Sequence, residues 1–104
     1  MKTQKYDIEK YPKAKKYLGE HLLKPYGQDN LNYSLILEIM IELIRKDITH
    51  TYRAIINRHN NRDAIRVLDV LDHSRLFDVK GPYCVLNNKG KDIVKRLEEI
   101  ISHS

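Results

Sequence analysis

The sequence predicts a mainly α-helical domain that carries one small β-hairpin. The first observation behind this prediction is that apolar residues recur at helical spacing through most of the 104 residues. The second is a pair of short strand-like runs, residues 76–79 and 83–86, on either side of a Lys-Gly-Pro turn. The third is a helical pattern on each side of this hairpin. A chain of this length can bury a core without disulfides or a metal.

The first thirty residues predict an amphipathic helix from about Pro12 to Leu23. Proline suits the first turn of a helix, and Pro25 and Gly27 would end it. The apolar residues at helical spacing are Ile8, Tyr11, Ala14, Leu18 and Leu22. We interpret residues 1–30 as a basic helical extension that packs on the rest of the chain, residues 31–104. The alternative is a nucleic-acid-binding arm, because lysines and tyrosines interleave there.

Asn32 is a suitable N-cap for the next helix, which is expected to run from Tyr33 to Lys46. This helix is apolar nearly all round, and its only predicted solvated stripe is marked by Glu38, Glu42 and Arg45. So much apolar surface requires a covering element on a second face. The N-terminal helix and a second subunit are the two candidates.

A short third helix is expected to end at Arg58, with Thr49 or Thr51 as its N-cap. Its inward-facing residues are predicted to be Tyr52, Ile55 and Ile56. A turn follows at residues 59–61, where Asn60 and Asp63 approximate a capping box. A fourth helix is therefore expected to begin near Asn61.

The fourth helix has a predicted buried stripe and an opposite polar face. The buried stripe is predicted to be Ala64, Ile65, Leu68 and Leu71. Arg62, Arg66 and Asp69 share the opposite face at i, i+4 and i+7. In the hairpin that follows, Gly81 is expected to be extended, because a proline comes next.

Asn87 is expected to cap the last helix. The apolar stripe of this helix is Ile93, Val94, Leu97, Ile100 and Ile101. A stripe that stays apolar to the end of the helix, together with the surplus apolar face of the second helix, predicts a homodimer.

A hairpin that follows a recognition-type helix is the wing of a winged helix-turn-helix, here with an extra N-terminal helix. The run from Leu35 to Ile100 resembles the small winged-helix regulators of archaea and their viruses, and more distantly the bacterial MarR- and PadR-type regulators. The pieces that carry the resemblance are Leu68-x-x-Leu71, then Leu76-Phe77 in place of Gly-Leu-Ile, and Tyr83 to Gly90 in place of Tyr-x-Leu-Thr-x-x-Gly. This resemblance implies a winged-helix fold and binding to duplex DNA.

The chain departs from these families at two points. Arg75 stands where they have a glycine, and the turn of the hairpin carries a single cation, Lys80. The first thirty residues lie outside the resemblance.

Positive charge is concentrated in two regions of a chain whose net charge is +5. Residues 1–30 carry seven lysines against four carboxylates, and residues 45–66 carry six cations against two. The second region coincides with the proposed helix-turn-helix. Such a charge distribution indicates a polyanionic partner.

Arg62 and Arg66 are expected to read bases in the major groove, because arginine bonds guanine O6 and N7 bidentately. The neighbouring asparagines suit adenine or phosphate, and the third helix and the wing would contact phosphates. The predicted DNA-binding residues are Thr49, Thr51, Arg53, Arg58, Asn60, Asn61, Arg62, Arg66 and Lys80. The alternative for all of them is a solvated, charged surface.

The sequence predicts no catalytic site, no metal site and no cofactor. No two of the five histidines lie at i, i+4, and Cys84 has no partner cysteine. The neighbouring glutamates at 38/42 and 98/99 are interpreted as surface pairs, and no nucleotide-binding or hydrolase motif is present.

The leading hypothesis is a cytoplasmic double-stranded DNA-binding protein, a homodimeric transcriptional regulator without a small-molecule substrate. No apolar run approaches the roughly 20 residues of a membrane span, so no membrane partner is expected. The alternatives are a winged-helix module that binds protein and an architectural chromatin protein.

Overall fold

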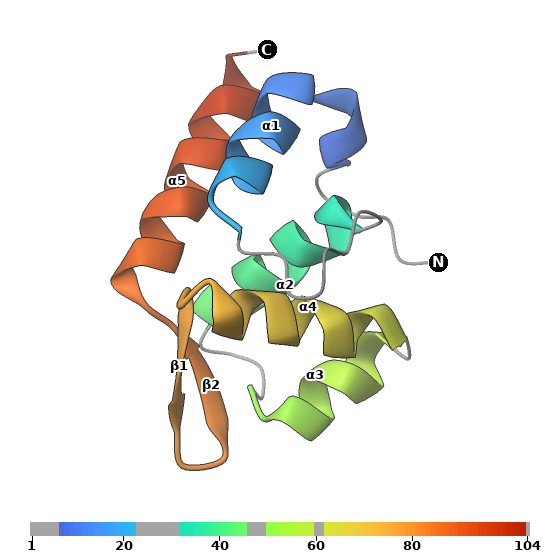
Figure 1. The fold of residues 1–104 in the computed structure, drawn as a ribbon, viewed down its shortest axis with the longest axis vertical. Helices are drawn as coiled ribbons and strands as arrows, with labels where there is room; N and C mark the ends of the chain where they lie inside the picture. The colour runs from blue at the N-terminus through green and yellow to red at the C-terminus, as the bar shows by residue number, and fades with distance from the viewer. Residues whose placement is uncertain (1–6, 23–31, 46–49, 60–61, 104) are drawn as a thin grey trace.

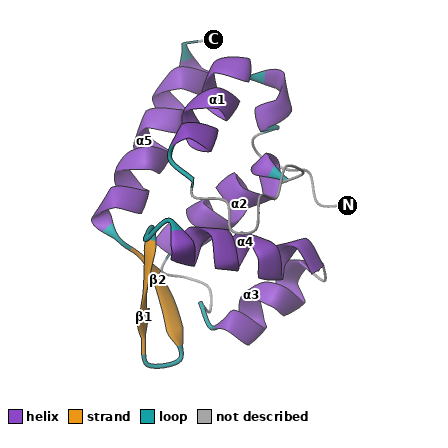
Figure 2. Ribbon diagram, in the orientation of Figure 1, coloured by secondary structure: helices purple, strands orange, loops and turns teal. Residues whose placement is uncertain are grey.

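The computed structural model describes residues 7–22, 32–45, 50–59 and 62–103. Within them the chain is mainly helical, with one two-stranded antiparallel hairpin (Figures 1 and 2). The elements are η1 (Ile8–Lys10), α1 (Pro12–Glu20), α2 (Tyr33–Ile44), α3 (Tyr52–His59), α4 (Arg62–His73), β1 (Phe77–Lys80), β2 (Tyr83–Leu86) and α5 (Asn88–Ser102). None of the described helices combines the length and the apolar character that crossing a membrane requires.

The N-terminal segment packs on the core through η1 and α1. Ile8, Ala14 and Leu18 are fully buried, and Ser34 on α2 accepts a hydrogen bond from the Ile8 backbone N–H at 3.2 Å. The predicted packing of this segment is confirmed for residues 8–22. Its helix ends at Glu20 rather than Leu23, because the next backbone N–H groups bond three residues back and tighten the last turn.

Helix α2 lies at the centre of the core. Its N-cap is confirmed, since the Asn32 side chain accepts from the Leu35 N–H at 3.0 Å. The helix ends at Ile44, two residues earlier than expected, where Arg45 turns to extended backbone. Helices α1, α4 and α5, strand β2 and η1 all contact α2. Other elements of the same chain therefore cover the second apolar face of α2, which was expected to need a covering element.

One residue of the predicted solvated stripe on α2 is buried. Glu42 is only 7% exposed, and its carboxylate faces Arg58 and His59 of α3. The prediction of a solvated surface pair at 38/42 is therefore wrong for Glu42. The reason is that the last two residues of α3 turn their side chains to this face, where their nitrogens meet the Glu42 carboxylate.

Thr51 is the N-cap of α3, because its hydroxyl accepts from the Ala54 N–H at 3.1 Å. The other predicted cap, Thr49, lies outside the described residues, as do Asn60 and Asn61. Ile55 is fully buried as predicted, whereas Tyr52 is 40% exposed. Tyr52 was expected to face inward, but the start of α3 lies beside the hairpin.

Helix α4 buries Ala64, Leu68 and Leu71 as predicted, together with Val67 and Val70. Ile65 was assigned to this stripe and is instead 56% exposed. The buried arc runs along the line 64, 67, 68 and 71, and the helix turns by about 100° per residue. A residue one position after Ala64 therefore emerges on the solvent side.

The end of α4 is closed by a residue with left-handed backbone. Arg75 has φ +56°, and the Leu76 N–H bonds the Leu71 carbonyl while the Arg75 N–H bonds that of Asp72. This is the Schellman pattern, which usually places glycine at the left-handed position. These bonds hold Leu76 at the helix end, so β1 begins at Phe77 and not at residue 76.

The hairpin pairs Phe77 with Leu86 and Lys80 with Tyr83, leaving a two-residue loop. Gly81 has φ +62°, so the prediction that it is extended is wrong. A two-residue hairpin loop requires positive φ at its first position when a proline follows, and this requirement overrides the effect of that proline. Thr51 forms an isolated bridge with Tyr83, which ties the start of α3 to the hairpin.

Helix α5 runs alongside α1 on one side of the molecule (Figure 1). Asn87 caps it as predicted, accepting from the Gly90 N–H at 2.9 Å. Ile93, Val94 and Leu97 are buried, and the two isoleucines at its end, at 100 and 101, are partly buried against the same core.

Candidate nucleic-acid interface

The solvent face of α4 carries most of the predicted base-reading residues that are described. Arg62 and Arg66 are exposed, one turn apart, with the exposed Ile65 beside them. The same face continues along the helix to Asp69 and Asp72. The two cations therefore lie in the N-terminal half of α4, which also carries Asp63 in its first turn, while Asp69 and Asp72 lie in its C-terminal half.

The two arginines of α3 lie in different environments. Arg53 is exposed. The Arg58 side chain is only 26% exposed, and its Nε lies 3.7 Å from Glu42 Oε1. Arg53 is therefore open to solvent, whereas Arg58 is engaged with a buried carboxylate.

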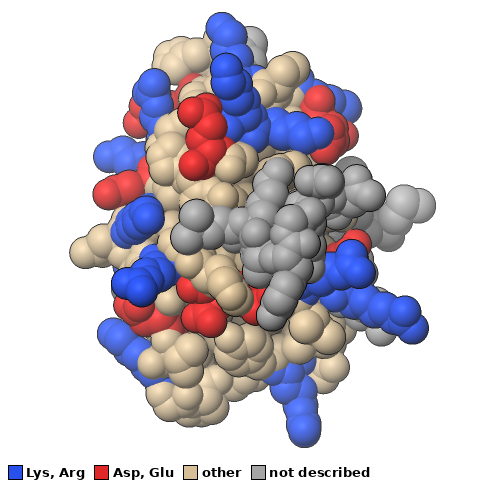
Figure 3. All heavy atoms as spheres, in the orientation of Figure 1, with Lys and Arg blue, Asp and Glu red and all other residues tan. Residues whose placement is uncertain are grey.

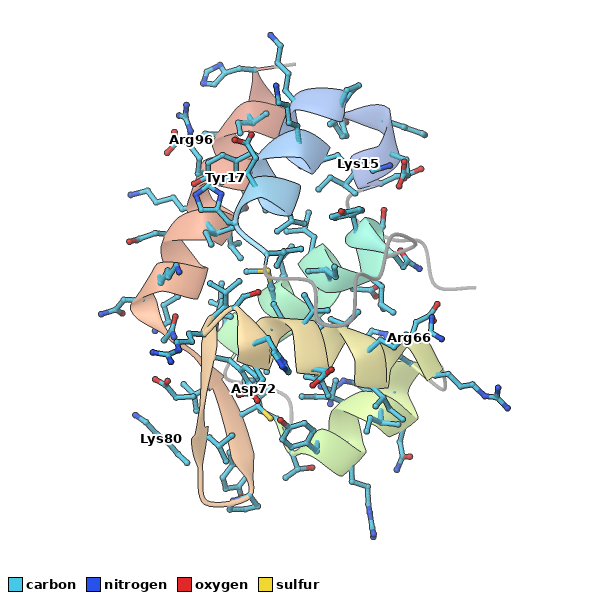
Figure 4. The ribbon with its side chains drawn as sticks, in the orientation of Figure 1. Lys15, Tyr17, Arg66, Asp72, Lys80 and Arg96 are labelled. Atoms are coloured by element: carbon cyan, nitrogen blue, oxygen red, sulfur yellow. The ribbon has the colours of Figure 1, made fainter. Side chains whose placement is uncertain are left out.

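Lys80 is exposed at the end of β1, but it lies apart from the α4 arginines. In the view of Figure 4, Lys80 and Arg66 lie on opposite sides of the molecule, and Asp72 lies between them. In this view an acidic residue, Asp72, therefore separates two of the predicted cations, Arg66 and Lys80. Figure 3 shows the same alternation, with acidic groups between the basic ones across this face.

Exposed apolar side chains accompany the charges. Tyr52, Ile65, Val79 and Tyr83 are each 40% exposed or more. Tyr52 stacks edge-on against Phe77, with ring centroids 6.2 Å apart. The exposure of Tyr52 and Ile65 was not predicted from the sequence, because the helical spacing of apolar residues assigned both to inward-facing stripes.

Cys84 lies in β2 with no exposed surface. Burial, and secondarily the Asp72 carboxylate, raises the pKa of this thiol to about 11. Burial also raises the pKa of Tyr52, with smaller contributions from Cys84, Asp72 and Asp69. A thiol that ionises so late is a poor nucleophile at neutral pH, and its complete burial makes Cys84 a packing residue of the core.

Sequence reasoning missed a second cluster, at the contact of α2 and α3. Glu38, Glu42 and His59 each offer one ligand atom, and these atoms lie within 4.8 Å of one another. The sequence pattern used for metal sites was a pair of histidines on one helix, whereas the residues of this cluster come from two helices, α2 and α3. The i, i+4 spacing of two glutamates on an otherwise apolar helix was the available signal.

Comparisons of this chain with protein-family models, with curated proteins and with solved structures find no match.

Proposed function

We propose that this chain is a double-stranded DNA-binding protein, a winged helix-turn-helix transcriptional regulator whose helix α4 enters the major groove. The observation that carries the proposal is the exposure of Arg62 and Arg66 on the first two turns of α4, the helix that precedes the hairpin. In helix-turn-helix proteins the N-terminal residues of the recognition helix reach the base edges.

The chemistry of these two turns suits base reading. Arginine can bond guanine bidentately, and an exposed aliphatic side chain such as Ile65 can contact the methyl group of thymine. Asp69 and Asp72 lie further along the helix, where they would repel phosphates if the whole helix lay deep in the groove. The proposal therefore has the N-terminal half of α4 entering DNA and the C-terminal half held away from it.

Helix α3 and the hairpin would position α4 on the duplex. Helices α3 and α4 are in contact, and the Thr51–Tyr83 bridge joins the start of α3 to the hairpin. Arg53 would contact a phosphate, and the Thr51 hydroxyl can donate its proton to another while it caps α3. Lys80 would reach flanking backbone.

Affinity for duplex DNA of random sequence tests this proposal. Fluorescence anisotropy at about 50 mM and about 200 mM salt should show binding that weakens on the order of 100-fold, as expected when three or four cations displace counterions. Absence of binding at the lower salt concentration would overturn the proposal.

A module that binds protein is the second candidate, and the exposed apolar residues favour it. Ile65, Val79 and Tyr83 are each at least half exposed, and carboxylates lie among them. Contiguous exposed apolar surface is typical of protein contacts, and two of these residues, Val79 and Tyr83, both lie on the hairpin. This candidate predicts no salt-dependent DNA binding, so the same experiment separates the two.

A further inference from the structure

Three side chains with metal-binding atoms meet where the end of α3 approaches α2. Glu38 and Glu42 lie one turn apart on α2, and His59 is the last residue of α3. Their ligand atoms lie within 4.8 Å of one another, and His59 Nε2 is 2.8 Å from Glu42 Oε2.

The cluster lies largely inside the protein. The His59 side chain is 6% exposed and that of Glu42 is 9% exposed, while Glu38 is half-buried at the edge. Arg58 approaches the other oxygen of Glu42, with Nε 3.7 Å from Oε1. Glu42 can therefore keep its contact with Arg58 through Oε1 and offer Oε2 to an ion. Ligating carboxylates commonly have such an outer partner.

We propose that Glu38, Glu42 and His59 form a binding site for a divalent transition-metal ion. Two ligands bonded at about 2.0–2.1 Å to one ion lie roughly 3.0–3.4 Å apart. The 2.8 Å between His59 Nε2 and Glu42 Oε2 is close to that separation. An ion could take the place of the proton between these two atoms if they moved apart by about 0.5 Å. The ligand atom of Glu38, which lies within 4.8 Å of both, would complete the set by moving closer.

The ligand set selects the class of ion. An imidazole nitrogen with two carboxylate oxygens suits Zn²⁺, Co²⁺ or a similar ion, whereas Mg²⁺ and Ca²⁺ prefer oxygen ligands alone. Three protein ligands leave at least one position for water. Since the ion would join α2 to the end of α3, binding should stabilise the folded chain.

A structural ion pair is the alternative account of these residues, and Glu38 distinguishes the two. Glu42 makes an ion pair with Arg58 and a hydrogen bond with His59, and neither contact requires a metal ion. A three-ligand site also needs the carboxylate of Glu38, which lies half-buried at the edge of the cluster.

Titration of the metal-free chain with Co²⁺, followed by visible absorption, and with Zn²⁺, followed by calorimetry, tests the site. The wild-type chain should bind one ion of either metal, Mg²⁺ should not displace it, and the melting temperature should rise. Glu38→Gln and His59→Gln should each weaken binding at least about tenfold. The matched control is His73→Gln, which removes the imidazole of the exposed His73–Asp69 pair, where Nδ1 and Oδ1 are 3.4 Å apart.

Wild-type chain that binds neither metal would overturn the proposal, and so would Glu38→Gln that binds as tightly as wild type. Loss of binding in His73→Gln, with binding kept in the other two variants, would move the site to α4 and contradict it as well. If His59→Gln fails to fold, Glu38→Gln still decides the matter. No DNA is present in these experiments, so their outcome is independent of the proposed function.

Discussion

Arg75 occupies a backbone conformation that normally belongs to glycine. Its φ of +56° closes the end of α4, and its carbonyl accepts a hydrogen bond of 2.7 Å from the Asn87 side chain. Left-handed backbone costs a residue with a Cβ about 1–2 kcal/mol. Part of this strain is offset because a non-glycine residue has less freedom in the unfolded chain.

Arg75→Gly should therefore raise the free energy of unfolding by about 0.5–1 kcal/mol, measured by urea denaturation. Arg75→Ala is the matched control, because it removes the same side chain and keeps the backbone strain, so it should bring no such gain. A loss of stability in the glycine variant would show that the arginine side chain makes a contact that outweighs the strain.

Two helical glycines are predicted to respond in opposite directions to the same substitution. A Cβ at Gly90 would lie 2.6 Å from the Leu76 carbonyl oxygen, whereas one at Gly19 would meet nothing closer than the Tyr33 hydroxyl at 3.5 Å. Gly90→Ala should cost about 1–3 kcal/mol through overpacking. Gly19→Ala should gain up to about 1 kcal/mol from helix propensity. Thermal unfolding measures both, and equal effects would contradict the packing described for Gly90.

Local chemistry explains which residues could be predicted from the sequence. The caps Asn32 and Asn87 were predictable because a cap bonds backbone within three residues of itself. Glu42 and Ile65 were not, because their burial depends on which face of the helix a distant element covers. Arg75 was recognised only as a departure from glycine, and its backbone angle explains why glycine is usual there.

At the scale of elements, α1 behaves as part of the core. Leu18 of α1 is fully buried, and α1 packs against α2 and α5. Leu18→Ala should lower the free energy of unfolding by about 2–5 kcal/mol, because it leaves a cavity. The exposed Lys16→Ala, on the same helix, should change it by less than about 0.5 kcal/mol. Equal, small effects in chemical denaturation would mean that α1 is a detached arm.

The periodicity of the apolar residues predicted which segments are helices and which are strands, but not where each element begins and ends. The helices at 33–44, 62–73 and 88–102 and both strands lie where the apolar pattern placed them. The ends of α1 and α2 and the start of β1 differ from the expected positions by one to three residues, because hydrogen bonds at helix ends compete with the apolar pattern. The turn at Gly81 was mispredicted because loop length, and not the following proline, sets its conformation.

The whole molecule offers less uncovered apolar surface for a homodimer than the sequence indicated. Other elements of the same chain cover the apolar surface of α2. The apolar residues that could still form a dimer contact are Ile100 and Ile101, which are partly buried at the end of α5. To read two half-sites, a two-fold dimer formed there must hold two α4 helices roughly 34 Å apart, one turn of duplex. Sedimentation at micromolar concentrations should show a dimer, and Ile101→Lys should dissociate it. A wild-type monomer, with and without DNA, would exclude this arrangement.

The sequence predicted which side chains of the candidate interface are exposed, but not which opposite charges lie next to them. The sequence placed Arg62 and Arg66 on the solvent face of their helix, and both are exposed there. It could not show that Arg58 turns toward Glu42, since that contact joins residues 16 positions apart. Nor could it show that Asp72 lies between Arg66 and Lys80, which depends on how the hairpin leaves α4 (Figure 4).

The central claim is that the N-terminal half of α4 faces DNA, and paired charge changes on this helix test it most directly. Asp69→Asn with Asp72→Asn should tighten binding, because the change removes two charges that repel phosphate. Lys13→Ala with Lys16→Ala is the matched control, since it removes two exposed cations from α1, at the other end of the molecule from α3 (Figure 1).

The decisive measurement is the anisotropy-derived affinity of Arg62→Ala with Arg66→Ala for duplex DNA, beside that control. The Arg62/Arg66 pair should lose about 1–3 kcal/mol of binding free energy per arginine, while the α1 pair should lose much less. Equal affinity losses for the two pairs, or none for the α4 pair, would contradict it.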